Sequence, residues 1–249
     1  SDLNAPEYQR LTGKQIGSKY GFIANGLFQS EEEIANSATV KGYKALPGYI
    51  KYVDRNGDGI ITAAQDQGYV GKSATPKHTG SLNLFGNWKG FDFDLLFSWG
   101  LGNVVALTGQ YTASGSEGTQ DNTSFTKPFY HGGNSPTFLV ENSWTPDHTN
   151  AEFPRLEITG PSNNNGYSST FWYRNGNYMR LKTAQIGYNF PKKWLNPAGI
   201  EGLRLYVEGY NLLTFSGLTK YNIDPESPAV NNGYYPQQRT YTLGVKLTF

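Results

Sequence analysis

The sequence contains no cysteine, few charged residues and no long apolar run. The absence of cysteine excludes disulfides, thiolate zinc sites and cysteine nucleophiles. Only 16% of the 249 residues are charged, and the 21 basic and 20 acidic residues nearly cancel, which argues against a nucleic-acid partner. The longest apolar run, residues 104–107, is far shorter than the roughly 18 residues of a membrane-spanning helix. These absences leave a neutral protein without helical membrane spans.

Aromatic residues and glycine are abundant instead. The chain has 18 Tyr, 14 Phe, 5 Trp and 30 Gly, a composition that favours strands and turns. Residues 91–101 alternate strictly, and one face would carry Phe91, Phe93, Leu95, Phe97, Trp99 and Leu101. This segment has the length of a membrane-spanning strand. Four further strands are predicted near 81–88, 178–190, 203–215 and 241–249, the first joined to 91–101 through a tight Lys89-Gly90 turn.

The predicted strands are joined by connections of very unequal length. Short ones, 89–90 and 191–202, share one side with the end of the chain, and long ones cover 1–78, about 102–177 and 216–236. Outer-membrane barrels show this asymmetry. Because five strands cannot close such a barrel, further strands must come from elsewhere. The sequence therefore predicts an all-β fold, about five C-terminal strands of a large transmembrane antiparallel β-barrel with long extracellular loops.

Two regions follow from this pattern. Residues 1–78 are predicted to form an extracellular loop region that contains a turn resembling a calcium loop. Residues 79–249 are predicted to form the C-terminal barrel strands with two further long extracellular loops.

Short stretches in a fixed order carry a resemblance that covers nearly the whole chain. They are GFIANGLFQ (21–29) followed by EEEI (31–34), PGYIKYVDRNGDG (47–59), WKGFD (88–92), WTP (144–146) with FPRL (153–156), YMRLK (178–182), LYVEGYNL (205–212) and a terminal Phe249. Together they resemble the last quarter of the SusC/RagA-like TonB-dependent transporters in the outer membrane of Bacteroidetes.

The resemblance implies a barrel of about 22 strands with an N-terminal plug and a TonB box. It implies import of oligosaccharides or peptides across the cell outer membrane, under a SusD-like surface lipoprotein that acts as a lid. The expected partners are the remaining N-terminal barrel and plug, this lipoprotein, the lipid bilayer, and TonB through the N-terminal part that these residues lack. No nucleic acid, no enzymatic activity and no catalytic residue are expected.

Residues 54–66 resemble the start of a calcium loop. Oxygen ligands at the first, third and fifth positions would be Asp54, Asn56 and Asp58, and the seventh position would supply the backbone carbonyl of Ile60. The twelfth position lacks the usual Glu, and Asp66 follows one place later. Either Ca²⁺ or another hard cation orders an extracellular loop here, or Asx turns and glycines form a metal-free hairpin. Ca²⁺ is the single cofactor predicted.

The long connections also carry candidate substrate-binding residues. Exposed aromatic side chains often anchor recognition, and we predict substrate contacts from Trp144, Trp172, Tyr173 and Arg174. The same aromatic class includes Tyr111, Tyr130 and Tyr167, and all of these rings could equally pack the loops against each other. The charged residues in or beside strands are predicted to face the lumen, because Arg or Lys on the lipid face costs about 2–4 kcal/mol at mid-depth. They are Arg174, Arg180, Lys182, Arg204, Glu208 and Lys246.

Two other protein classes remain open at this point. A secreted, soluble β-sandwich that binds glycan would use residues 54–66 as its calcium site and would bury the apolar face of 91–101 against a second sheet. A glycoside hydrolase needs two placed carboxylates. Asp92 and Asp94 share a strand face, but a polar barrel lumen explains them better.

Overall fold

The computed structural model describes residues 4–107, 137–156, 164–227 and 237–249. These residues form two compact units. The first, here called the loop unit, contains the described residues of 1–74 and 104–174. The second, the strand unit, contains those of 75–103 and 175–249. The loop unit thus combines residues from both sides of the division at 78 that the sequence suggests.

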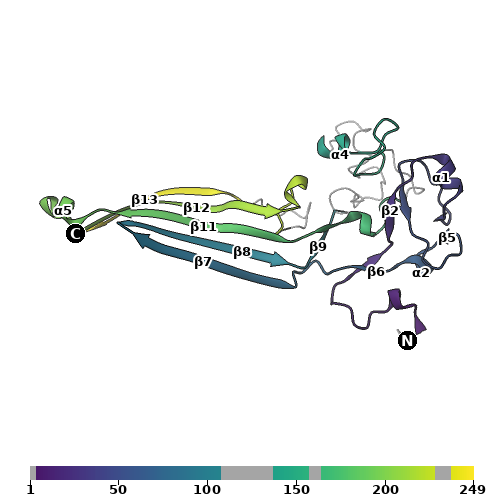
Figure 1. The fold of residues 1–249 in the computed structure, drawn as a ribbon, viewed down its shortest axis with the longest axis horizontal. Helices are drawn as coiled ribbons and strands as arrows, with labels where there is room; N and C mark the ends of the chain where they lie inside the picture. Colours follow the sequence, from purple (N-terminus) through teal and green to yellow (C-terminus); the bar gives the residue numbers. More distant parts are fainter. Residues whose placement is uncertain (1–3, 108–136, 157–163, 228–236) are drawn as a thin grey trace, which may run out of the picture. The chain divides into compact units, whose positions relative to one another are not determined.

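A five-stranded antiparallel sheet makes up most of the strand unit (Figure 1). Its order is β13-β12-β11-β8-β7, so the neighbours in space follow the order of the strands along the chain. The strands are β7 (His78–Trp88), β8 (Phe91–Leu101), β11 (Tyr178–Asn189), β12 (Gly202–Ser216) and β13 (Thr240–Thr248). All five predicted strands are confirmed, with ends that differ by a few residues.

The short connections lie at one end of this sheet. Lys89 and Gly90 both have positive φ values, 49° and 92°, as a two-residue type I′ hairpin requires. The register pairs Trp88 with Phe91 and Asn189 with Arg204. The same end holds the connection with α5 (Lys192–Leu195) and η5 (Asn196–Ala198), together with the end of β13. The predicted sorting of short connections to one edge is confirmed.

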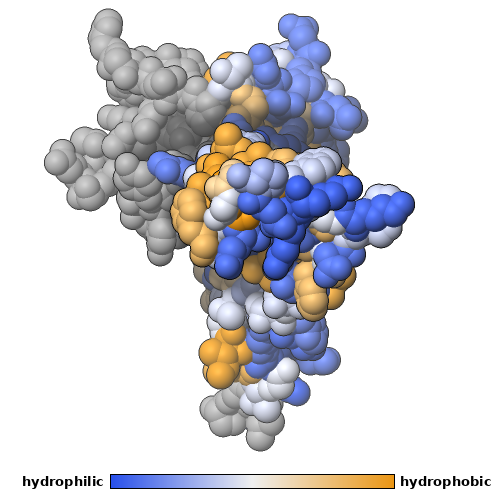
Figure 2. Space-filling model, turned by 90° about the vertical axis from the view of Figure 1, so that its left-hand side faces the viewer, coloured by the Kyte–Doolittle hydropathy of each residue, from blue (hydrophilic) through white to orange (hydrophobic). Residues whose placement is uncertain are grey.

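One face of the sheet is apolar and open. The register sets Phe93, Ile186, Val207 and Leu243 in one row across four strands. These side chains are 44–77% exposed, although in water such a row is normally buried. In the described residues no second sheet covers this face, so the sandwich alternative is not supported. Viewed from the end that carries α5, apolar and hydrophilic residues gather in separate areas of the surface (Figure 2).

The opposite face of the sheet is polar. Asp94, Gln185, Glu208 and Thr242 form one row across β8, β11, β12 and β13. A sheet with one lipid-compatible face and one polar face is what the wall of a transmembrane barrel requires.

A β-bulge interrupts the alternation in β11. Leu181 pairs with Phe97, but Thr183 pairs with the adjacent Leu96, so Lys182 is an extra residue there. Without it, Arg180 would share the apolar face of Ala184 and Ile186. β12 compensates with an irregularity of its own near Asn211, whose φ is 53°.

The loop unit consists of short elements. Two-residue to four-residue strands form four small two-stranded pairs, β1-β6, β2-β4, β3-β5 and β9-β10. The strands are β1 (Lys19–Gly21), β2 (Ala24–Leu27), β3 (Thr39–Val40), β4 (Ile50–Tyr52), β5 (Ile60–Ile61), β6 (Gly68–Gly71), β9 (Val104–Ala106) and β10 (Tyr173–Asn175). The helical turns are η2 (Glu7–Gln9), α1 (Glu31–Ala35), α2 (Ala63–Asp66), α4 (Thr137–Glu141) and η4 (Thr170–Trp172), and the strand unit adds η6 (Thr219–Tyr221).

Side chains from distant parts of the sequence form the core of the loop unit. Phe22, Ile50, Ile61, Phe153 and Trp172 are all fully or almost fully buried. Within the described parts of the chain, no helix combines the length and the apolar character needed to cross a membrane.

Candidate functional site

An ion pair spans three strands on the polar face. Arg204 on β12 donates through Nε and Nη2 to the carboxylate of Asp92 on β8, at 2.9 and 2.5 Å. It also donates to Gln185 Oε1 at 2.7 Å, and Asn189 donates to Asp92 at 2.7 Å. Gly187 permits this crossing, because a Cβ there would lie 2.5 Å from the guanidinium group. The predicted lumen orientation of Arg204 and Asp92 agrees with this register.

A second ionic cluster lies near the opposite end of the strands. Arg180 donates to Glu226 at 2.6 Å, to Asp224 at 2.7 Å and to Thr214 Oγ1 at 2.9 Å. Lys182 donates to the same oxygen of Glu226 at 2.8 Å. Sequence reasoning placed the two basic residues toward the lumen but missed their acidic partners. The sequence alone does not indicate that Asp224 and Glu226, which follow β12, contact Arg180 on β11. Only the folded structure shows this contact.

Trp172 lies in the core of the loop unit. Its side chain has 0% exposure, its ring stacks on Phe153, and it makes an edge contact with Phe171. Nε1 donates to the carbonyl of Asn165 at 2.7 Å. An indole buried in this way presents no face to a sugar. The packing alternative therefore describes Trp172 better than substrate contact does.

The other three predicted substrate residues are buried or half-buried, and each has a hydrogen-bond partner within the loop unit. Trp144 is buried and donates through Nε1 to Gln29 at 3.2 Å. Tyr173 shares a hydrogen bond of 2.6 Å with Ser168, and burial raises the pKa of its hydroxyl. Arg174 donates to the carbonyl of Phe171 and to Glu152 Oε1. Substrate binding by these side chains stays a prediction. Of the other aromatic residues in this class, Tyr111 and Tyr130 lie outside the described residues.

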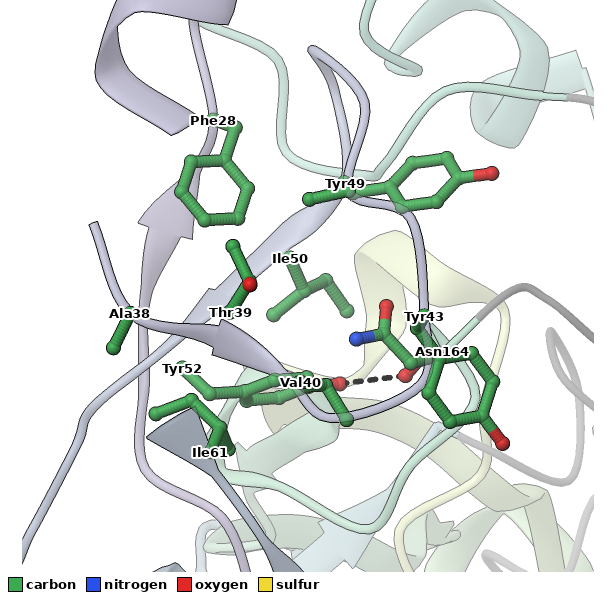
Figure 3. A pocket seen from close by; sticks show the side chains of 11 residues that line it. Phe28, Ala38, Thr39, Val40, Tyr43, Tyr49, Ile50, Tyr52, Ile61 and Asn164 are labelled. Atoms are coloured by element: carbon green, nitrogen blue, oxygen red, sulfur yellow. Dashed lines mark hydrogen bonds between the residues drawn. The ribbon is translucent and has the colours of Figure 1, made fainter. Parts of the chain in front are cut away.

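A small hollow lies within this core and is lined by both apolar and polar side chains (Figure 3). Ile50 and Ile61 line it, and the carboxamide of Asn164 points among the lining side chains. The hydroxyl of Tyr52 donates to the backbone carbonyl of Asn164 at 2.9 Å, and complete burial raises the pKa of Tyr52. Burial, together with a hydrogen bond to Tyr43, raises the pKa of Tyr167 to about 12.

The Asp54 loop is closed by its own carboxylates. Asp54 accepts the backbone N–H groups of Gly59 and Gly57, each at 2.7 Å, and these bonds lower the pKa of its carboxyl. Asp58 accepts the N–H of Ile60 at 2.9 Å.

Two other predicted ligands, Asn56 and Asp66, also have partners inside the loop. Asn56 donates to the carboxylate of Asp58 at 2.8 Å. Asp66 is fully buried and accepts the N–H groups of Arg55 and Thr62, at 2.8 and 2.7 Å. In the described residues no group of three or more His, Cys, Asp or Glu side chains converges to hold a metal. The geometry fits the metal-free hairpin, and calcium binding stays a prediction.

The two-faced antiparallel sheet belongs to the wall of a transmembrane β-barrel. No family model matches this chain. Among curated proteins it is similar to TonB-dependent receptor P3 of Formosa agariphila, 31% identical over 251 residues, which are 95% of this chain and 22% of the receptor. It is also similar to TonB-dependent receptor P26 of the same organism, 29% identical over 263 residues, 99% of this chain and 24% of the receptor.

Solved structures show the same fold. The RagAB peptide transporter matches with a TM-score of 0.60 and 23% identity over 93% of this chain and 23% of that chain. The RagAB peptide importer in its open-open state matches with a TM-score of 0.59. The chain spans about a quarter of the length of these relatives. These matches confirm its resemblance to the C-terminal part of a SusC/RagA-like TonB-dependent outer-membrane transporter, and the relatives are named as receptors and importers rather than enzymes.

Proposed function

We propose that this chain is the C-terminal portion of an outer-membrane nutrient importer that is energised through TonB. The observation that carries the proposal is the two-faced sheet, whose apolar side chains are exposed while Arg204 and Arg180 form ion pairs on the opposite face. The similarity to proteins named TonB-dependent receptors supports it.

In this proposal the strands supply part of the barrel wall. Backbone N–H and C=O groups left unpaired in lipid cost several kcal/mol each, so the outer edges of β7 and β13 would pair with strands of the remaining barrel. The loop unit would form part of the extracellular cavity and would contact a SusD-like lid lipoprotein. The structural neighbours carry a two-component name, RagAB, which supports such a pairing.

Peptides are the cargo to test before oligosaccharides. Sugar recognition commonly uses exposed aromatic platforms, but Trp144 and Trp172 of the loop unit are both buried. The structural neighbours are named as a peptide transporter and a peptide importer. Both observations favour peptides over oligosaccharides for this chain.

The first test is the native mass of the particle extracted from source membranes in detergent, with every polypeptide in it identified. We expect a particle far larger than 27.6 kDa that contains the rest of the barrel and a surface lipoprotein. A species of 27.6 kDa that stays in solution without detergent would refute the proposal.

The second test compares uptake of labelled peptides and oligosaccharides by cells with and without the gene. Uptake of peptides should depend on the gene and on an energised inner membrane. Uptake of both cargo classes that is unchanged by the deletion would refute an import role.

A further inference from the structure

An ionic cluster around the buried side chain of Arg180 attaches the segment after β12 to the strands. This segment, residues 217–227, contains η6, and its Asp224 and Glu226 both bind Arg180. The side chain of Arg180 is 3% exposed, and Nε, Nη1 and Nη2 each donate a hydrogen bond. A guanidinium group that binds two carboxylates in charge-assisted hydrogen bonds fixes their orientation as well as their distance.

The β-bulge in β11 is what brings these groups together. It turns Arg180 to the polar face, where it stands opposite Ser98, and Lys182 reaches Glu226 from the bulge itself. Bulges often redirect a side chain at the rim of a barrel. Arg180 lies near the start of β11, at the end of the sheet opposite the short connections.

The segment itself contains mostly local hydrogen bonds. The backbone N–H groups of Tyr221 and Ile223 donate to the carbonyl of Leu218, and that of Asn222 donates to Thr219. These bonds shape a turn, and the side chains of Leu218, Tyr221 and Ile223 within it are buried. The ionic cluster adds to this apolar packing a directional link between the segment and β11.

We propose that Arg180, with Lys182 beside it, is the positioning residue that anchors residues 217–227 over the polar face of the strands. If the proposed import function holds, cargo passing this end of the wall meets the segment in the position that Arg180 sets. Only this consequence rests on the proposed function; the anchoring does not.

The test is amide hydrogen exchange in the complete detergent-solubilised transporter. Arg180→Gln should speed exchange at Tyr221, Asn222 and Ile223 by about tenfold or more, because the segment then opens independently of the wall. Arg180→Lys, which keeps the charge, should give an intermediate rate. Arg204→Gln is the matched control, since that arginine pairs with Asp92 on the same face and does not contact the segment. Equal rates in Arg180→Gln and the wild type, or equal effects of both Gln variants, would overturn the proposal.

A second variant covers the case in which Arg180→Gln fails to assemble. Asp224→Asn combined with Glu226→Gln leaves β11 intact, and it should also speed exchange in 217–227 by about tenfold. An unchanged rate in this variant would overturn the anchor as well.

Uptake measurements then separate the two claims. Faster exchange with unaltered peptide uptake would keep the anchor and remove its part in import. Absence of uptake in the wild type would refute the proposed function and leave the exchange result intact.

Discussion

Replacing Trp172 by alanine separates a packing role from a substrate-binding role for this residue. The indole is fully buried, contacts Phe153 and Phe171, and donates to the carbonyl of Asn165. Truncation would open a cavity in the core of the loop unit. We therefore expect the loop unit to loosen.

The magnitude follows from the buried area. An aromatic side chain of this size buries roughly 200 Å², which at about 25 cal/mol per Å² corresponds to about 5 kcal/mol. Measured losses for Trp→Ala in cores are about 3–5 kcal/mol. Because about 1.4 kcal/mol equals a factor of ten, exchange through local opening should rise roughly 100-fold to several-thousand-fold.

The assay is amide hydrogen exchange on the detergent-solubilised transporter. The reporters are the amides of Leu107 and Thr170, which donate to the carbonyls of Trp172 and Phe22. Trp194→Ala is the matched control, since this indole is 60% exposed and lies in the strand unit. In Trp194→Ala, hydrogen exchange at the Leu107 and Thr170 amides should stay near the wild-type rate.

The reasoning would be refuted by a specific pair of results. If Trp172→Ala left both reporter amides as protected as in the wild type while peptide binding was lost, the residue would act on cargo rather than in packing. Trp172→Phe refines the test. It keeps most of the apolar contact and removes the N–H donor, so we expect a smaller loss of about 1–2 kcal/mol.

Three further predictions concern other parts of the chain. A hydrogen bond from Lys51 and one from a neighbouring backbone N–H lower the pKa of Glu33. The stability that Glu33 gives α1 is therefore present above its unfolded pKa, near 4.3, and is lost as the pH falls through the lower folded value. Hydrogen-exchange protection factors of the α1 amides should therefore drop as the pH falls through this range. Protection factors that do not change with pH would contradict the stabilising role of Glu33. Millimolar Ca²⁺ is expected to slow amide hydrogen exchange in residues 54–66 of the wild type but not of Asp54→Asn. Exchange that Ca²⁺ does not slow in the wild type would refute calcium binding and support the metal-free hairpin. Gly187→Leu should displace the Arg–Asp ion pair and cost about 1–3 kcal/mol in denaturant unfolding, whereas Gly202→Ala meets only an ordinary contact at 3.5 Å. Equal losses of unfolding free energy in the two glycine variants would contradict the inference that Gly187 makes room for the Arg204–Asp92 ion pair.

The strands could be read from the sequence because their signal is local. In 91–101, large apolar residues recur at every second position, and a strand turns every second side chain to the same face. The Lys89-Gly90 turn is equally local, since only two residues must adopt positive φ. The lumen orientation of Arg204 and Lys246 also followed from the cost of exposing charge to lipid. The ordered motifs further indicated the family, which the comparisons confirm.

Local patterns did not determine which loop residues are buried. Tryptophan is a residue type that often anchors recognition, but the ring of Phe153 stacks on Trp172 and the carbonyl of Asn165 accepts its N–H. The partners of Arg180 were hidden for the same reason, since Asp224 and Glu226 lie more than forty positions away.

The sequence by itself therefore determined the strands, their two faces and the family. The tertiary structure decided where the faces change along β11 and which charges meet. The physical reason is that alternation has a period of two, so one inserted residue, Lys182, exchanges the faces of everything beyond it. Such a bulge depends on pairing with both neighbouring strands, and a single strand's pattern does not contain that pairing.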